Sequence, residues 1–258
     1  MGVWVFRACA VLMACVWSLG AAAASAQTVD ELVARHIAAR GGADKLKAIE
    51  TMKITRTIAT PFTSVQVVLF KKRPNLLRIE QTAKGQTTPS IRGLNAEAAW
   101  DIAEGKVVVR PEVIAIEGLE IDGDFDGLLV DWKAKGHTVT YEGKATVGLA
   151  DAYKLKVTTK GGTVREVYLD ASTFLEAQVV GRVRLPALDP KTKEHRFYTT
   201  TIVYSDYRDV NGVKIPFSID EERVEGPITQ SFAIYTDKVE VNVPMDDSLF
   251  APPSSAAK

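Results

Sequence analysis

The chain has 258 residues, 46% of them hydrophobic, and its 32 basic residues balance its 32 acidic residues. A sequence without a basic surplus or a basic stripe does not fit a nucleic-acid-binding protein. Its two cysteines, Cys9 and Cys15, both lie near the N-terminus, so the rest of the chain carries no disulfide, no thiol nucleophile and no cysteine-based metal site.

Residues 1–26 have the pattern of a cleavable secretory signal. Arg7 is their single charge, an apolar run follows from Ala8 to Leu19, and Ala24-Ser25-Ala26 is a small-x-small cleavage pattern. The apolar run is shorter than the about 20 residues of a membrane-spanning helix. We therefore expect cleavage after Ala26 and a periplasmic protein whose mature net charge is about −1.

A lipid anchor is the alternative to cleavage after Ala26. Leu12-Met13-Ala14-Cys15 has the outline of a lipobox, in which Cys15 would be lipidated. The apolar run before Cys15 is very short, and a second apolar stretch follows it, which is unusual for a lipoprotein signal. A lipidated Cys15 would make the protein a membrane-tethered receptor, whereas cleavage after Ala26 would release a diffusing carrier.

Two helices are predicted at the start of the mature chain. Thr28 and Glu31 form a capping box, and apolar residues recur at helical spacing up to Ile37. Gly41-Gly42 is expected to end this helix, and a short second helix follows, with Leu46 and Ile49 on one face.

From Met52 onward the apolar residues alternate with polar ones, which predicts strands. Short strands with turn signals every 8–12 residues indicate an antiparallel sheet or barrel rather than βαβ units. The predicted strands cover 52–58, 64–72, 77–80, 90–95, 98–102, 107–109, 139–147, 153–158, 164–169, 174–185, 196–207, 213–223 and 229–235.

Residues 111–136 interrupt the strands. They are predicted to form a long loop, acidic up to Asp126, and then a short amphipathic helix with Leu128, Leu129 and Trp132 that ends at Gly136. Residues 251–258 are expected to be a disordered tail. No linker or repeat divides the sequence between them, so residues 27–250 are predicted to form one domain.

Several segments together resemble the periplasmic outer-membrane lipoprotein-sorting proteins, the LolA/LolB-like family. They are the N-terminal helix pair ending in Gly41-Gly42, the first strand, Asp131-Trp132-Lys133-x-Lys135-Gly136-His137, Asp151-Ala152-Tyr153-Lys154-Leu155, Tyr168-Leu169-Asp170, and Ser205-Asp206-Tyr207-Arg208-x-x-x-Gly212-x-x-x-Pro216. The resemblance covers nearly all of the mature chain and contains no catalytic signature.

The resemblance implies a mainly β fold with a few helices. A strongly curved antiparallel sheet would form an incomplete barrel, and lid helices would close over its concave face. The cavity would hold the acyl chains of a lipoprotein or of another hydrophobic ligand. A monomer that exchanges this cargo with inner- and outer-membrane transfer partners is the implied organisation.

The strand pattern is compatible with such a cavity, because residues 67–70 are apolar on both faces and need cover on both. An acyl chain costs about 0.8 kcal/mol per CH₂ exposed to water, so a carrier needs apolar surface and little chemistry. The candidate cavity residues are Met52, Ile54, Ile58, Val67 and Leu69, and the candidate lid residues are Leu128, Leu129 and Trp132.

Arg56 is the most informative single position, since it shares a strand face with Met52, Ile54 and Ile58. The lipoprotein carriers of the family have an arginine inside the cavity that bonds the lid, and Arg56 resembles it. It would then bind a lid carbonyl or a lipid headgroup. The alternative, which the residues alone favour slightly, is that this face turns to solvent or that Arg56 extends to water.

No catalytic or cofactor motif accompanies these residues. Asp122, Asp124 and Asp126 resemble the start of a calcium loop, but Lys133 occupies the position where the last ligand, a glutamate, is required, so a solvated acidic loop is favoured. The three histidines are scattered. The sequence thus predicts a non-enzymatic carrier without metal or cofactor. The alternatives are an envelope sensor or interaction domain on the same fold and, last, an enzyme.

Overall fold

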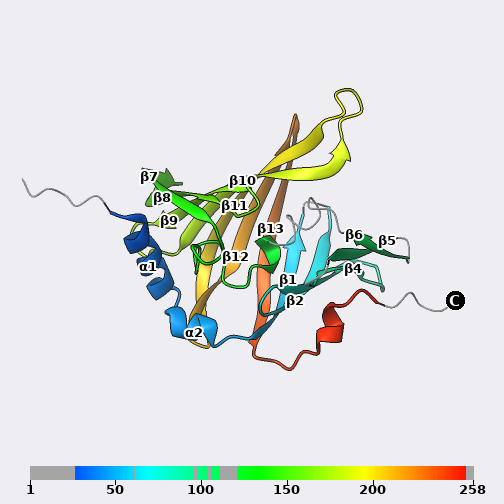
Figure 1. The fold of residues 1–258 in the computed structure, drawn as a ribbon. Coiled ribbons are helices and arrows are strands. Elements are labelled where there is room, and N and C mark those ends of the chain that lie inside the picture. Colours follow the sequence, from blue (N-terminus) through cyan, green and yellow to red (C-terminus); the bar gives the residue numbers. More distant parts are fainter. Residues whose placement is uncertain (1–26, 61, 96–97, 104–105, 111–120, 254–258) are drawn as a thin grey trace, which may run out of the picture.

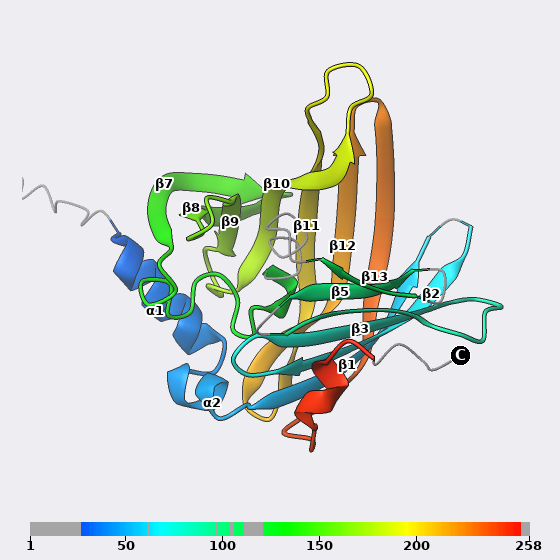
Figure 2. The same cartoon turned by 45° about the vertical axis from the view of Figure 1, so that its right-hand side comes forward.

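Thirteen antiparallel strands form one continuous, strongly curved sheet in the computed structural model, as Figures 1 and 2 show. The structure describes residues 27–253 apart from 61, 96–97, 104–105 and 111–120. The strand order is β6-β5-β4-β3-β2-β1-β13-β12-β11-β10-β9-β8-β7, so the first and last strands of the chain are neighbours at the centre. The two ends of the sheet do not pair with each other, and the barrel stays open.

The helices and strands have the following bounds: α1 Val29–Ala39, α2 Ala43–Lys47, β1 Thr51–Ala59, β2 Ser64–Lys72, β3 Leu76–Ala83, β4 Ser90–Leu94, β5 Ala99–Ala103, β6 Lys106–Arg110, β7 Thr138–Val147, β8 Ala150–Thr158, β9 Val164–Asp170, β10 Glu176–Leu188, β11 His195–Val210, β12 Val213–Glu225, β13 Ile228–Val241 and the 3-10 helix η1 Asp247–Phe250. No helix in the described part of the chain is long and apolar enough to cross a membrane.

The predicted capping box starts α1. The Thr28 side chain accepts a hydrogen bond from the backbone N–H of Glu31, whose carboxylate accepts one from the backbone N–H of Thr28. Gly41 and Gly42 both have positive φ and end the helix. A Cβ on Gly41 would lie 2.1 Å from the carbonyl oxygen of Gly212, so glycine lets the helix pair rest directly on the turn between β11 and β12.

Strand phase decides which side chains face the helices. Ile58 of β1 pairs with Val65 of β2 on one side and with Ile234 of β13 on the other, and directly paired residues share a face. Asp237 is an extra residue in β13, between the partners of Thr55 and Arg56. The bulge is in β13, so β1 stays regular against β2 and keeps Arg56 on the same face as Ile54 and Ile58.

Two local predictions were wrong. Residues 128–136 form turns instead of a helix, because Gly127 and Asp131 both have positive φ and interrupt helical geometry. The strand predicted to end at Leu185 continues to Leu188, because Leu188 pairs again with His195 of β11 after an irregular stretch of the ladder. Pro186 lies within that irregular stretch, where a missing N–H is tolerated.

The convex face of β3–β5 is covered by η1. Phe250 is fully buried there, and its carbonyl accepts a hydrogen bond from Trp100 Nε1 at 3.0 Å. A Cβ on Gly93 would lie 2.5 Å from the Trp100 ring, so the absence of a side chain makes room for the indole. Residues 251–253 follow η1, and the rest of the predicted tail lies outside the described residues.

Candidate functional site

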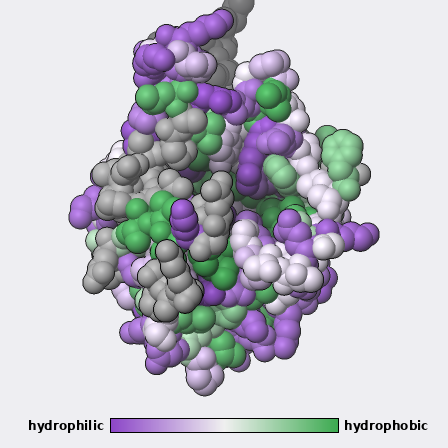
Figure 3. Space-filling model, turned by 90° about the vertical axis from the view of Figure 1, so that its right-hand side faces the viewer, coloured by the Kyte–Doolittle hydropathy of each residue, from purple (hydrophilic) through white to green (hydrophobic). Residues whose placement is uncertain are grey.

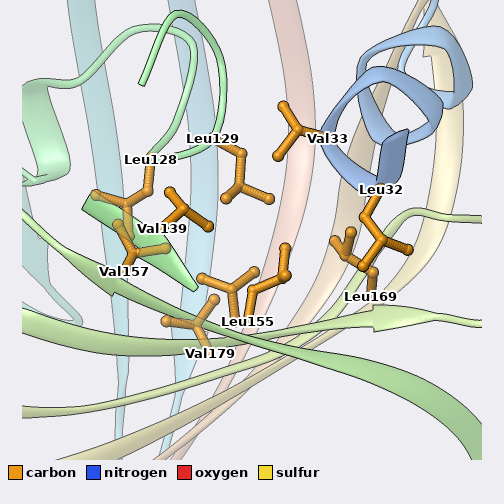
Figure 4. Close-up of a cluster of buried hydrophobic side chains, with 10 residues drawn as sticks. Leu32, Val33, Leu128, Leu129, Val139, Leu155, Val157, Leu169 and Val179 are labelled. Carbon is orange, nitrogen blue, oxygen red and sulfur yellow. The ribbon is translucent and has the colours of Figure 1, made fainter. Parts of the chain in front are cut away.

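The helix-covered part of the concave face is filled by protein. Leu32 and Val33 of α1 and Leu128 and Leu129 of the following segment pack onto strands β7–β10, as Figure 4 shows. Leu129 is 0% exposed. The strand residues of this cluster are Val139, Leu155, Val157, Val167, Leu169 and Val179. This part of the face therefore offers no free surface to a ligand.

A second cluster extends the packing to the centre of the sheet. Met52 and Ile54 of β1 pack with Ile49, Phe125 and Val130. The Arg73 guanidinium holds this region together, since it binds both carboxylate oxygens of Asp126 at 2.6 and 2.7 Å and the carbonyls of Leu46 and Ile49. Residues 125–130 are thus anchored to the concave face by both apolar and ionic contacts.

Beyond these clusters the same face is less covered. Five apolar residues of four strands are half-buried here: Ile58 of β1, Val65 of β2, Ile202 of β11, and Phe232 and Ile234 of β13. We call these five residues the open patch. Figure 3 shows a hollow on the side of the molecule that carries β5 and β6, with hydrophobic and hydrophilic residues around it.

The structure brings the predicted cavity residues onto this one face. Ile54 pairs with Leu69, Arg56 with Val67 and Ile58 with Val65. Their surroundings differ, however. Met52, Ile54 and Val67 are buried by protein, whereas Ile58 and Leu69 are half-buried. Of the predicted lid residues, Leu128 and Leu129 are buried and Trp132 is half-buried against the helix cluster.

Arg56 points into the concave side. Its Nε is buried and has no hydrogen-bond partner among the described residues. Burial lowers the pKa of Arg56, while the nearby Tyr204 and Asp122 favour its charged form. Tyr204 belongs to β11, so Arg56 of β1 interacts electrostatically with a strand beyond β13 and β12. A buried guanidinium without a full set of acceptors can accept an anionic or carbonyl partner.

Lys71 and Asp122 share this environment. Lys71 Nζ donates a hydrogen bond of 2.9 Å to the Asp124 carbonyl, and burial lowers the pKa of Lys71 to about 8. Burial raises the pKa of Asp122, against the opposing effect of Arg92, Lys71 and Arg56. Asp122 is nevertheless an exposed residue.

The other aspartates of the 122–126 string have separate partners. Asp124 binds Lys135 Nζ through both oxygens at 2.6 and 2.8 Å, and Asp126 binds Arg73. Both are largely buried, so the predicted solvated loop is instead packed against the sheet. Within the described ranges, no group of three or more His, Cys, Asp or Glu side chains could hold a metal ion.

A cavity of about 540 Å³ lies elsewhere, at the base of the hairpin between β10 and β11. Phe197 and Thr199 line it, and they alternate with Tyr198, which faces the concave side near Arg223. The cavity is therefore largely on the opposite face of the sheet, and we do not include it in the candidate site.

Known structures share this architecture. A LolA superfamily protein from Nitrosomonas europaea superposes with a TM-score of 0.56 over 88% of this chain and 98% of that chain, at 11% identity. This chain has the LolA fold. An outer-membrane lipoprotein-sorting protein domain from Vibrio parahaemolyticus matches with a TM-score of 0.49 over 86% and 95% of the two chains, at 9% identity. No family model and no curated protein matches the sequence.

The LolA fold confirms the predicted incomplete barrel. Sequence reasoning nevertheless missed several residues of the concave site, namely Val65, Lys71, Arg92, Ile202 and Ile234. Lys71 could have been found, because it follows Val67 and Leu69 at the spacing of one strand face, as Arg56 follows Ile54. Ile234 could not, because only the pairing of β1 with β13 brings it beside Ile58.

Proposed function

We propose that this protein is a periplasmic carrier that binds the acyl chains of a lipoprotein, or of another hydrophobic ligand, on the concave face of its open barrel. The observation that supports this proposal is the open patch, a group of apolar side chains that protein covers only in part. Burying an acyl chain there would remove apolar surface of both partners from water, at about 25 cal/mol per Å².

The LolA fold supports the same proposal by analogy, because the similar protein from Nitrosomonas europaea is described as a LolA superfamily protein. We further propose that residues 1–26 are removed on export, that residues 27–250 act as one domain, and that Ile58, Leu69 and Arg56 belong to the ligand site. We also propose that the protein is a monomer that transfers its ligand between inner- and outer-membrane partners without covalent chemistry.

The direct test is the ligand content of the protein. The full-length chain is expressed for export in a Gram-negative bacterium, purified from the periplasm and extracted with organic solvent. Mass spectrometry of the extract is expected to detect lipid or acylated peptide. A clean extract, together with no binding of the neutral fluorescent probe N-phenyl-1-naphthylamine, would contradict the proposal.

Val65 and Gln66 provide a matched pair of variants for this test. They are neighbours in β2 but lie on opposite faces, Val65 in the open patch and Gln66 exposed on the convex side. Val65→Asp places a charge among the apolar side chains and should abolish probe binding, whereas Gln66→Asp should leave it unchanged. Equal effects of the two substitutions would show that the ligand does not use the open patch.

A further inference from the structure

A cluster of cations lies beside the open patch. The concave face carries Arg56 of β1, Lys71 of β2 and Arg92 of β4, as the register shows. Arg56 pairs with Val67, which lies on the same face of β2 as Leu69 and Lys71. Leu69 pairs with Ile79 of β3, and Ile79 pairs with Arg92. Arg56 is also two residues from Ile58 of the open patch. Charged and apolar binding surfaces are therefore adjacent.

Most acidic groups on this face already have a cation of their own. Glu221 binds Arg223 at 2.6 and 2.9 Å, Asp124 binds Lys135, and Asp126 binds Arg73. Glu176 lies at the helix-covered end, 3.9 Å from His36.

Asp101 pairs in register with Arg92. Asp122 is then the one carboxylate of the described face that Arg56 and Lys71 share.

Arg56 and Lys71 are thus two half-buried cations that share the Asp122 carboxylate. Each of them loses hydration on burial, and Arg56 Nε has no acceptor among the described residues. Such a site stabilises an additional negative charge, because charge-assisted hydrogen bonds are strong where water is excluded. Asp122 belongs to the segment over the sheet and not to the sheet itself, so its carboxylate can be exchanged without disrupting a strand.

We propose that the ligand of the open patch is an amphiphile with an anionic headgroup, a phosphate or a carboxylate, which Arg56 and Lys71 bind in place of the Asp122 carboxylate. This inference rests on the proposed function and adds the chemical class of the ligand. The apolar chain lies on Ile58, Ile234 and Phe232, and the headgroup lies on the two cations. Asp122 interacts electrostatically with both cations, so its charge acts as an internal competitor of the headgroup.

Three probes with the same chain and different charges test the inference. Decyl phosphate, 1-decanol and decyltrimethylammonium are compared by displacement of N-phenyl-1-naphthylamine at pH 7. Decyl phosphate is expected to bind at least about tenfold more tightly than decanol, the factor that one charge-assisted hydrogen bond supplies, and the cation is expected to bind most weakly. Inorganic phosphate, measured by calorimetry, separates a lipid headgroup from a free anion and is expected not to bind measurably.

Variants locate the effect. Arg56→Gln should weaken the binding of decyl phosphate about tenfold and change the binding of decanol less than twofold. Asp122→Asn removes the competing charge and should strengthen the binding of decyl phosphate, a gain that a misfolded variant could not show. Lys53→Gln is the control, since Lys53 lies on the same strand but on the convex face, where its Nζ is 5.5 Å from the centre of the Phe70 ring.

Three outcomes would overturn the inference. Equal affinities for decyl phosphate and decanol would be compatible with a carrier but would show that it has no anion site. Phosphate that binds as tightly as decyl phosphate would assign the site to a free anion. If Arg56→Gln weakened the binding of decyl phosphate and of decanol equally, Arg56 would have a structural role and would not bind the headgroup. If none of the decyl probes binds, the proposed function fails together with the inference.

Discussion

The two halves of the concave face differ in what covers them, although the same strand pattern builds both. Under α1 and residues 125–130, the inward side chains are buried, with Leu129 and Leu155 both 0% exposed. The side chains of the open patch are only half-buried, although Ile58 and Val65 pack against a third buried cluster that includes Val67 and Ile79. Arg56 and Lys71 share the same face. Alternating apolar residues therefore predict a face that needs cover, but they do not say whether protein or ligand provides it.

The two halves of the concave face have different roles. The covered half supplies the free energy of folding, because its apolar surface is removed from water in the protein itself. The open half keeps apolar surface partly hydrated and holds charges in a poorly solvated site, both of which reduce stability and favour a ligand. Substitutions in the two halves should consequently separate stability from binding.

The largest loss of stability is expected for Leu129→Ala, which leaves a cavity between α1 and β7–β10. The free energy of unfolding should fall by about 3 to 5 kcal/mol, as for other fully buried leucines. Urea denaturation followed by circular dichroism measures it. A loss below about 1 kcal/mol would mean that the segment leaves the sheet easily and that the covered half is not a fixed core.

The next largest effect is expected at the ion pair between Arg73 and Asp126. Asp126→Asn leaves the guanidinium without its bidentate partner and should cost about 3 kcal/mol, the lower end of the range for a broken buried pair. Combining it with Arg73→Met should restore part of the loss, because the unpaired charge is then removed. Additive losses in the double variant would show that the two side chains are not coupled.

Much of the fold follows from local sequence. The capping box at Thr28, the glycine stop at Gly41-Gly42 and the strand over 64–72 were predicted from residues alone and are confirmed. These features depend on backbone groups only a few residues apart. A helix was predicted over 128–136 because Leu128, Leu129 and Trp132 fit helical spacing. This prediction was wrong, since positive φ at Gly127 and Asp131 and packing under α1 produce turns instead.

The candidate site depends on contacts that sequence spacing does not contain. The phase of β1 correctly placed Arg56 with Ile54 and Ile58, but phase could not say which face is concave. The meeting of Arg56 with Tyr204 and Asp122 requires β1 to pair with β13, which is about 180 residues away in the chain. Local spacing alone favoured a solvated acidic loop for residues 122–126, whereas Asp124 and Asp126 are paired and largely buried.

A moderate, pH-dependent effect is expected for Lys71. Its pKa is about 8 in the folded protein and near 10.5 when unfolded, so between these values the unfolded state binds more protons. Stability relative to Lys71→Met should therefore rise between pH 8 and 10.5, by about 2 kcal/mol after allowance for partial exposure. Asp124, Asp122, Arg56 and Arg40 face this ammonium and set its pKa.

Urea denaturation of both proteins at several pH values measures this difference. Lys53→Met, on the convex face, controls for the loss of one positive charge. Over the same interval, binding of decanesulfonate, whose own charge is constant, should weaken as Lys71 loses its proton. A stability difference between wild type and Lys71→Met that stays flat across the interval would place Lys71 in water instead of in the hollow.

The smallest effect on stability is expected for Ile58→Ala, in the open half. Ile58 is half-buried, so the loss should be about 1 kcal/mol, well below that of Leu129→Ala. Binding of N-phenyl-1-naphthylamine should nevertheless weaken severalfold, because the removed methyl groups belong to the surface on which the ligand lies. A variant that loses stability as Leu129→Ala does, and keeps full affinity, would show that protein already covers this part of the face. The open patch would then be part of the core, and a ligand would have to bind elsewhere on the barrel.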